Sequence, residues 1–262
     1  MSETGRLIGE TGLVPKKSKG QNFLTDGATA DRQVARAGIS KGDRVLEVGP
    51  GFGVLTERLV RESEHVTCIE LDDKLADYIS EKFGDAVTLI RGDALKVKWP
   101  EFDVFVSNLP YSVSTPIIFK LLEQNFRNAV IMVQKEFAER MTARPGTSDY
   151  SRLTVGVYYR SACKMLETVP SSRFNPRPKV DSAVVSLVSR PAPFGVEDEK
   201  LFFRVTETCF THRRKKIGTA LKNARIIGGD AELPYLDDRI EVLSPEEIAE
   251  LSNRIYGLRR AP

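Results

Sequence analysis

Four apolar runs in the first half of the chain are each followed by residues that suit a nucleoside ligand. The first leads into a glycine-rich loop, which permits tight turns and close approach of the backbone to a ligand at a helix N-terminus. The second ends at Glu70, whose carboxylate can accept both hydroxyls of a ribose. The third ends at Asp93, which can accept a hydrogen bond from the exocyclic amine of adenine. The loop glycines are Gly49, Gly51 and Gly53.

The fourth run ends at Asn108, and the chain leaves it through "NLPYSVSTP", residues 108–116. Asn and Pro are common in turns, so ordinary loop chemistry explains this stretch when it is taken alone. The glycine loop is also a weak signal, because its spacing is G-x-G-x-G whereas dinucleotide sites prefer G-x-G-x-x-G. Four such strand ends in succession are harder to attribute to coincidence, and together they favour a nucleotide site.

These positions require strands that alternate with helices. The expected strands are the β-branched runs Val45–Val48, Val66–Leu71, Val87–Ile90, Val104–Val106 and Ala129–Val133. Apolar residues at helical spacing predict helices at Val54–Arg61 and Asp73–Phe83. The alternation predicts an α/β fold with a doubly wound, mainly parallel sheet. Ligands of such sheets bind at the carboxyl ends of the strands, where the four polar ends would meet.

The chain is expected to divide at a linker. Two further β-rich runs, Lys164–Val169 and Ala183–Val188, precede "SRPAPFG" at 189–195, which carries two prolines and a glycine. Beyond it the pattern becomes helical. We therefore predict one domain at residues 1–190 and a small helical domain at residues 191–262.

One helix of the second domain has a clear start signal. The residues Ser-Pro-Glu-Glu at 244–247 form a capping box with proline at the first helical position, and they open a helix through about Ile255. The stretch Ser151–Tyr159 fits either a strand or a helix.

Composition narrows the class of protein. The chain has 262 residues, of which 41% are hydrophobic and 29% charged, as in soluble globular proteins. No apolar run reaches membrane-spanning length and the N-terminus lacks a signal-peptide pattern, so we expect a cytoplasmic protein. The three cysteines lie far apart and there are only two histidines. That argues against a metal site, a disulfide scaffold and histidine-based catalysis.

Net charge is only +3, but the basic residues are clustered. Neither the stretch from Thr11 to Thr25 nor the stretch from His212 to Arg225 contains an acidic residue. Such runs are commonly solvated faces, and they also suit an RNA-binding surface. We expect the second cluster on a helix, where consecutive residues cannot all face one way. The candidate RNA-binding residues are Lys16, Lys17, Lys19, Arg213, Arg214, Lys215, Lys216 and Lys222.

The segment "VLEVGPGFG" at 45–53 resembles the first motif of class I S-adenosylmethionine (SAM)-dependent methyltransferases. Glu70 and Asp93 match the acidic positions of their second and third motifs. "NLPY" is similar to the [DNS]-P-P-[YF] class, whose members methylate an amino group on a base or an amide. The resemblance implies SAM as the cofactor and an amine as the methyl acceptor.

In that class the turn of this type binds the amine that is methylated. The resemblance therefore implies a role for each of the four residues of NLPY. The Asn108 side-chain oxygen and the Leu109 carbonyl would accept hydrogen bonds from the two N–H groups of the amine. They would thereby stabilise the positive charge that develops on nitrogen. Pro110 would fix the turn. Tyr111 would stack on the base, a contact worth about 1–3 kcal/mol.

Five segments, in order along the chain, resemble the rRNA adenine N6,N6-dimethyltransferases of the KsgA type. That family methylates two adjacent adenosines near the 3′ end of small-subunit rRNA. The likeness spans about residues 16–222, and the segment beyond it carries no matching motif. The segments are "KSKGQNFLTD" (17–26), "NLPYSVSTP" (108–116), "QKEFAERM" (134–141), "SRLTV" (151–155) and "FNPRPKVDSAVV" (174–185).

This resemblance implies further site residues. Phe174 would be a second aromatic wall for an adenine flipped out of its stack. Lys19 stands where many relatives have an apolar residue, which puts the N-terminal arm's contact with RNA in question. The cofactor-binding residues implied are Asn22, Leu24, Gly49, Gly51, Gly53, Glu70, Asp93, Ala94 and Asn108.

Several functions stay open at this stage. Small-subunit rRNA dimethylation by a monomer bound to the small ribosomal subunit or its precursor is the leading hypothesis. The nearest rival is the related large-subunit rRNA group that confers macrolide resistance, although "FNPRPKVDSAVV" and the basic "RRKKIGTAL" favour the first. A non-catalytic ribosome-assembly factor, or a protein like mitochondrial transcription factor B, would keep the same fold. A small-molecule methyltransferase is least supported, because it needs no basic clusters.

Overall fold

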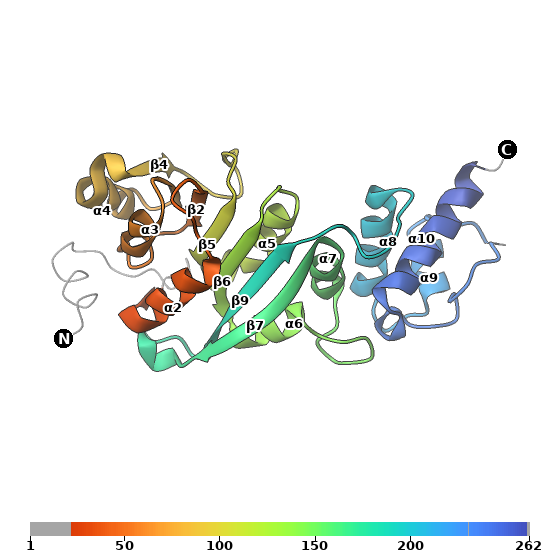
Figure 1. The fold of residues 1–262 in the computed structure, drawn as a ribbon. Helices are drawn as coiled ribbons and strands as arrows, with labels where there is room; N and C mark the ends of the chain where they lie inside the picture. Colours follow the sequence, from red (N-terminus) through yellow and green to blue (C-terminus); the bar gives the residue numbers. More distant parts are fainter. Residues whose placement is uncertain (1–21, 230, 261–262) are drawn as a thin grey trace. The chain divides into compact units, whose positions relative to one another are not determined.

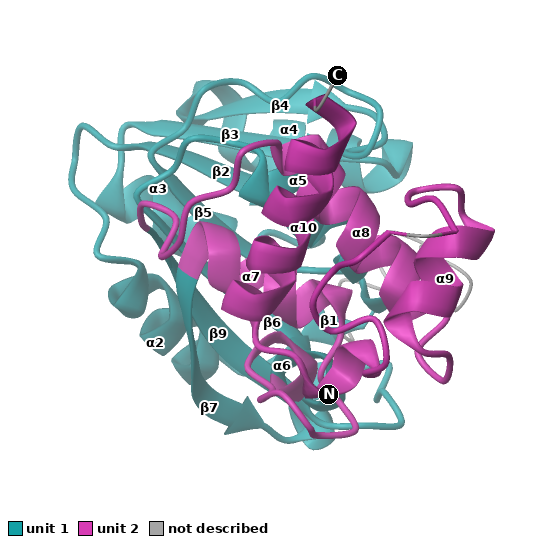
Figure 2. Cartoon of the chain, turned by 90° about the vertical axis from the view of Figure 1, so that its right-hand side faces the viewer, with its two compact units in different colours: residues 1–138, 162–189 teal, residues 139–161, 190–262 magenta. Residues whose placement is uncertain are grey.

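The computed structural model describes residues 22–229 and 231–260, which form two compact units (Figures 1 and 2). The first contains the described residues up to Ala138 together with Ala162–Ser189. The second contains Glu139–Ser161 together with the described residues from Arg190 onward. The sequence analysis placed residues 139–161 in the first domain, whereas here side chains of this segment join the apolar core of the C-terminal helices.

The first unit is built on a seven-stranded sheet with the order β4-β3-β2-β5-β6-β9-β7. The first five of these strands pair in parallel, and β9 pairs antiparallel with β6. The predicted α/β fold with a mainly parallel sheet is confirmed. The strands are β2 (Arg44–Val48), β3 (His65–Glu70), β4 (Val87–Arg91), β5 (Val104–Asn108), β6 (Asn128–Gln134), β7 (Ser161–Val169) and β9 (Ser182–Ser189).

Helices pack against this sheet, which explains why its central strands are apolar on both faces. In β6, for example, the consecutive residues 129–133 are all buried. The helix at Asp73–Phe83 has the predicted bounds. Its N-terminus is fixed by the Asp72 side chain, which accepts a hydrogen bond from the Lys74 N–H, and its apolar face is buried at Leu75 and Ile79. The helices of the unit are α2 (Gly27–Ala37), α3 (Thr56–Glu62), α4 (Asp73–Phe83), α5 (Ser114–Leu122) and the first four residues of α6 (Lys135–Met141).

The central strands β2 and β5 separate toward their carboxyl ends. Their register pairs Leu46 with Phe105 and goes no further. On the outer sides, by contrast, β2 stays paired with β3 as far as Val48, and β5 stays paired with β6 as far as Asn108. Since the chain order reverses between β2 and β5, this opening is the crevice in which an α/β sheet binds its ligand.

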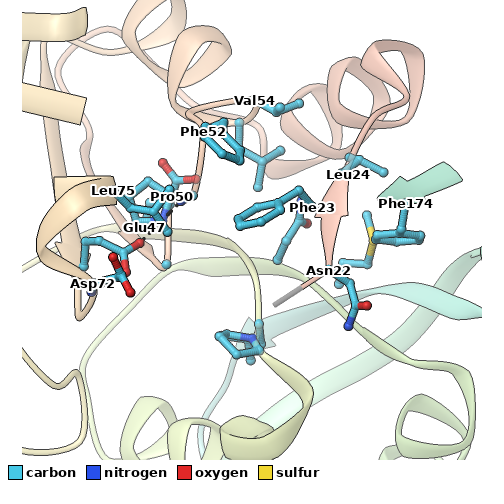
Figure 3. Close-up of a pocket in the computed structure, with 18 of the residues that line it drawn as sticks. Asn22, Phe23, Leu24, Glu47, Pro50, Phe52, Val54, Asp72, Leu75 and Phe174 are labelled. Atoms are coloured by element: carbon cyan, nitrogen blue, oxygen red, sulfur yellow. Dashed lines mark hydrogen bonds between the residues drawn. The ribbon is translucent and has the colours of Figure 1, made fainter. Parts of the chain in front are cut away.

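A short antiparallel ribbon joins two segments that lie far apart in the sequence. β1 (Phe23–Leu24) pairs with β8 (Phe174–Asn175). The Thr25 N–H and hydroxyl both donate to the Arg173 carbonyl, at 2.8 and 2.9 Å. The ribbon brings the "NFLTD" and "FNPRPK" segments side by side, as seen in Figure 3.

The second unit is helical, and its core is formed by residues such as Phe202, Val205, Leu221 and Ile248. The predicted capping box is present, since the residue 247 N–H donates to the Ser244 hydroxyl at 3.2 Å. The ambiguous stretch at 151–159 proves helical. The helices are α7 (Arg152–Arg160), α8 (Glu199–Thr211), α9 (Ile217–Asn223) and α10 (Pro245–Arg260).

The cysteines Cys68, Cys163 and Cys209 are all free. Across the described residues, no group of three or more His, Cys, Asp or Glu side chains is placed to hold a metal ion. Within the same residues, no helix is both long enough and apolar enough to cross a membrane.

Candidate active site

A pocket of the first unit lies between the glycine loop, the NLPY turn and the β1–β8 ribbon (Figure 3). Among the described residues, Gly53, Asp93 and Ala94 do not line it. The predicted site residues that line it are Asn22, Leu24, Gly49, Gly51, Glu70, Asn108, Leu109, Pro110, Tyr111 and Phe174. Lining residues that the sequence analysis did not propose include Phe23, Glu47, Phe52, Leu71, Asp72, Leu75 and Met132.

Backbone conformation explains the three glycines of the loop. Gly49, Gly51 and Gly53 have φ angles of 71°, 59° and 75°, in the left-handed region that side chains rarely adopt. A Cβ on Gly51 would lie 3.0 Å from the Phe23 ring, and one on Gly53 would lie 2.6 Å from the Phe83 ring. Gly53 therefore allows the loop to pack on α4, whereas Gly49 and Gly51 face the pocket.

Glu70 ends β3 and ties that strand to the glycine loop. It is 6% exposed. Its carboxylate accepts hydrogen bonds from the Asp72 N–H at 2.9 Å and the Gly51 N–H at 3.4 Å. Burial raises the pKa of Glu70, and these backbone donors oppose the shift. Each carboxylate oxygen can accept more than one hydrogen bond, so capacity remains for a ligand hydroxyl.

A second carboxyl group, Glu47, also lines the pocket and is 1% exposed. Its Oε2 accepts a hydrogen bond from the Thr56 hydroxyl at 2.6 Å and a weak one from the Cys68 thiol at 3.5 Å. Burial raises the pKa of Glu47 to about 7, and the nearby Glu70 charge adds to the shift. The sequence signal that could have identified it is an acid two residues before the first glycine.

The NLPY turn presents an acceptor with free capacity. Asn108 Oδ1 is buried and has no hydrogen-bond partner among the described residues. Leaving a buried amide oxygen unpaired costs about 1–3 kcal/mol, which a bound ligand with a donor would recover. The Leu109 N–H donates to the Met132 carbonyl at 3.0 Å, so the turn is fixed against β6.

Two aromatic rings predicted to hold a base also line the pocket. The Tyr111 hydroxyl lies 2.6 Å from the Ser182 hydroxyl, which fixes the ring, and burial raises the pKa of Tyr111. Phe174 stands on β8 and is 6% exposed. The structure therefore brings together NLPY and Phe174, which lie in segments matched only through the family resemblance.

Asp93 and Ala94 lie in the loop that follows β4. The Asp93 Oδ1 accepts a hydrogen bond from the Leu95 N–H at 2.9 Å, which closes a turn. The loop begins beside the pocket, because the Gly92 N–H donates to the Glu70 carbonyl at 2.8 Å. Their role in cofactor binding stays a prediction, since neither residue lines the pocket.

The predicted helix through the basic cluster of the second unit is wrong for Arg213–Lys216, whereas Lys222 does lie on a helix. α8 ends at Thr211 and α9 begins at Ile217, with a turn between them. Arg213 explains the turn: its guanidinium pairs with Glu241 at 2.6 Å and donates to two backbone carbonyls of the segment 147–148. These contacts hold Arg213 in the unit's own structure, which leaves little of its charge for RNA.

Two other basic residues of the cluster are also engaged. Lys216 pairs with Asp237 at 2.9 Å, and the Lys222 ammonium donates to a backbone carbonyl at 2.6 Å. Arg214 and Lys215 are exposed and form no ion pair with any described residue. They are therefore the best placed of the cluster to contact a phosphate. The other predicted RNA-binding residues, Lys16, Lys17 and Lys19, lie outside the described residues.

The comparisons with known proteins agree with this geometry. The family model described as ribosomal RNA adenine dimethylase matches residues 14–256. The chain belongs to the ribosomal RNA adenine dimethylase family. The match extends well past residue 222, where the resemblance of motifs ends, so most of the second unit is also part of the family.

Two curated relatives illustrate the likeness. A protein of Methanosarcina mazei named probable ribosomal RNA small subunit methyltransferase A is 45% identical over 250 residues, which are 91% of this chain and 92% of that one. A protein of the same name from Thermococcus gammatolerans is 41% identical, over 94% of this chain and 91% of its own.

Solved structures of the family share the fold. A dimethyladenosine transferase from Plasmodium falciparum has a TM-score of 0.75 at 30% identity, covering 87% of this chain and 95% of that one. The 23S rRNA methyltransferase ErmE has a TM-score of 0.65 at 29% identity, covering 90% of this chain and 100% of its own. One of these structures is thus named for dimethyladenosine transfer and the other for methylation of 23S rRNA.

We predict that Glu47→Gln changes how stability depends on pH. Because the pKa of Glu47 rises from 4.5 to about 7 on folding, the contribution of this group to wild-type stability falls as pH rises between these values and is constant above them. Glutamine cannot lose a proton, so over this window the variant gains about 1–3 kcal/mol relative to wild type. Urea unfolding at about pH 5 and about pH 8 measures the difference.

The matched control is Glu62→Gln, which removes an exposed carboxyl group from the last turn of α3. Its unfolding free energy should keep the wild-type pH profile. A Glu47→Gln profile parallel to that of wild type would contradict the ionisation assigned to this buried group.

Proposed function

We propose that the chain is an enzyme that transfers methyl groups from SAM to the N6 amino groups of two adjacent adenosines near the 3′ end of small-subunit (16S) rRNA. The observation that carries the proposal is the buried, unpaired Asn108 oxygen in a pocket that Tyr111 and Phe174 also line. Membership of the ribosomal RNA adenine dimethylase family and the small-subunit names of the curated relatives support the substrate.

The described residues of the pocket fit SAM. Two buried carboxyl groups, Glu47 and Glu70, favour a ligand that carries positive charge, and Glu70 would accept the ribose hydroxyls. The left-handed glycines at 49 and 51 let the backbone approach the ligand, and Asn22 and Leu24 would contact it from the β1–β8 ribbon. When bound, SAM supplies an electrophilic methyl group.

The residues of the NLPY turn would activate the amine. The nitrogen of an adenine amine is a poor nucleophile, because its lone pair is delocalised into the ring. Asn108 Oδ1 and the Leu109 carbonyl would accept hydrogen bonds from its two N–H groups and stabilise the positive charge that develops on nitrogen. Tyr111 and Phe174 would hold the base after it has left its stack. No side chain has to remove a proton before transfer, because the cationic nitrogen that the transfer produces loses its proton to solvent afterwards.

The same reaction on large-subunit rRNA is the second candidate. The likeness to the 23S rRNA methyltransferase ErmE is the observation that favours it. The curated relatives favour the small subunit at higher identity. A substrate on the small subunit or its precursor would place the enzyme in the cytoplasm, where we propose that it acts as a monomer.

The test offers labelled SAM and unmethylated small or large subunits to the protein, and then maps the modified bases. We expect two adjacent dimethylated adenosines near the 3′ end of the small-subunit rRNA. Asn108→Ala should lower the rate about 100- to 1,000-fold, as when one group that stabilises developing charge is removed. Part of the loss can appear in SAM affinity, since Asn108 also lies in the cofactor pocket.

The control is Asn125→Ala, which removes an exposed amide and should keep the wild-type rate. Label found on large subunits instead would select the second candidate. Wild-type transfer by Asn108→Ala would contradict the role of the NLPY turn.

The second unit is proposed to hold rRNA through the turn between α8 and α9. Phosphate contacts position RNA without reading its sequence, and their number sets the salt dependence of affinity. Replacing both Arg214 and Lys215 with Gln should flatten the slope of log affinity against log salt by about 0.7–0.9 for each lost contact. The adenosines that are modified should not change. Filter binding of small subunits at several salt concentrations measures the slope.

The control carries the same charge change elsewhere in the unit. Lys200 and Arg204 are exposed residues of α8, and replacing both with Gln should leave the slope near its wild-type value. Equal slopes for wild type and the Arg214/Lys215 variant would show that these two residues are solvated and make no contact with rRNA phosphates.

A further inference from the structure

The loop after β4 is held by an unusual set of donors. It carries Asp93, the residue that the family resemblance assigns to the adenine amine of SAM. The loop turns on itself, because the backbone N–H groups of Lys96 and Val97 both donate to the Asp93 carbonyl, at 2.8 and 2.9 Å. Its first residue, Gly92, is bonded to the Glu70 carbonyl. The loop is therefore tied to the pocket at its start.

The far side of the loop is anchored through the Ala94 carbonyl. This oxygen accepts a hydrogen bond from the indole N–H of Trp99 at 2.8 Å. Trp99 is 5% exposed and stacks on Phe105 of β5, with ring centroids 5.5 Å apart. The indole is thus a fixed donor that connects the loop to the central sheet.

A second donor to the same oxygen comes from α5. The half-buried Lys120 ammonium donates to the Ala94 carbonyl and to the Val97 carbonyl, both at 2.7 Å, and lies 5.2 Å from the centroid of the Trp99 ring. It therefore closes the segment 94–97 by bonding both of its ends. Burial lowers the pKa of Lys120, and the charges of Asp93 and Glu123 oppose that shift.

The helix that carries Lys120 begins at the NLPY turn. The Ser114 hydroxyl at the start of α5 donates to the Pro110 carbonyl at 3.1 Å. The last turn of the same helix contains Lys120. One short helix thus connects the proposed amine-binding turn to the loop of Asp93.

We propose that Lys120 is a positioning residue that holds the loop of Asp93 in place to recognise the adenine amine of the cofactor. The inference rests on the proposed function, because it takes SAM as the ligand. Lys120 itself does not contact the cofactor in this account. It acts through the Ala94 and Val97 carbonyls, and its removal frees the segment between them.

The test measures recognition of the amine rather than activity. S-adenosylhomocysteine carries the adenine amine, and S-inosylhomocysteine has an oxo group in its place. We expect wild type to prefer the adenosyl compound by at least about 10-fold, the effect of one hydrogen bond to a charged group. Lys120→Met keeps the apolar stem without the ammonium, and its preference should fall below about 3-fold. Calorimetric titration of both ligands gives the ratio.

Two further variants keep the result interpretable. Lys98→Met removes an exposed lysine from the same connection between β4 and β5 and should keep the wild-type preference. Trp99→Phe keeps a ring but removes the indole N–H, and should also reduce the preference. The Trp99→Phe variant serves as the test in place of Lys120→Met if thermal unfolding shows that Lys120→Met does not fold.

The outcomes separate this inference from the proposed function. A wild-type protein that binds neither compound overturns the proposed function and the inference with it. A wild-type protein that binds both equally shows that the loop does not recognise the amine, and overturns the inference alone. An unchanged preference in Lys120→Met, or in Trp99→Phe where it takes that variant's place, also overturns the inference alone.

Discussion

The separation of β2 and β5 is the constraint on which the site depends. Past Leu46 and Phe105 the two strands no longer pair with each other, yet each stays bonded to its outer neighbour. The gap is bridged by one fully buried side chain, since the Ser107 hydroxyl donates to the Val48 carbonyl at 2.6 Å. The residues that follow these two are the first loop glycine and Asn108, so this hydrogen bond fixes the start of the glycine loop relative to Asn108.

Burial of carboxyl groups gives this crevice its chemical character. Ionised groups are expensive to bury without a partner, and Glu47 and Glu70 both line the pocket with raised pKa values. A ligand with a positive charge and several hydroxyls offsets that cost. The unpaired Asn108 oxygen adds a need for a hydrogen-bond donor. These features are the basis for proposing a cationic nucleoside and an amine as the two ligands of the pocket.

Much of this arrangement could be predicted from the sequence. The strands and α4 follow from apolar periodicity and a helix cap, and the polar strand ends follow from the rule for parallel sheets. The β1–β8 ribbon could not be predicted that way, because strands of two residues each carry no periodicity and lie about 150 residues apart. Glu47 was missed because its role depends on burial. Arg213 was assigned to RNA because its partner, Glu241, is adjacent only in the folded chain.

In the proposed site, Glu70 holds the cofactor in this crevice. Calorimetric titration of SAM into wild type and a folded Glu70→Ala variant tests it most directly. Loss of hydrogen bonds from the ribose hydroxyls to a buried charged group should weaken binding by about 10- to 100-fold. Equal affinities in the two proteins would contradict the placement of the cofactor between β2 and β5.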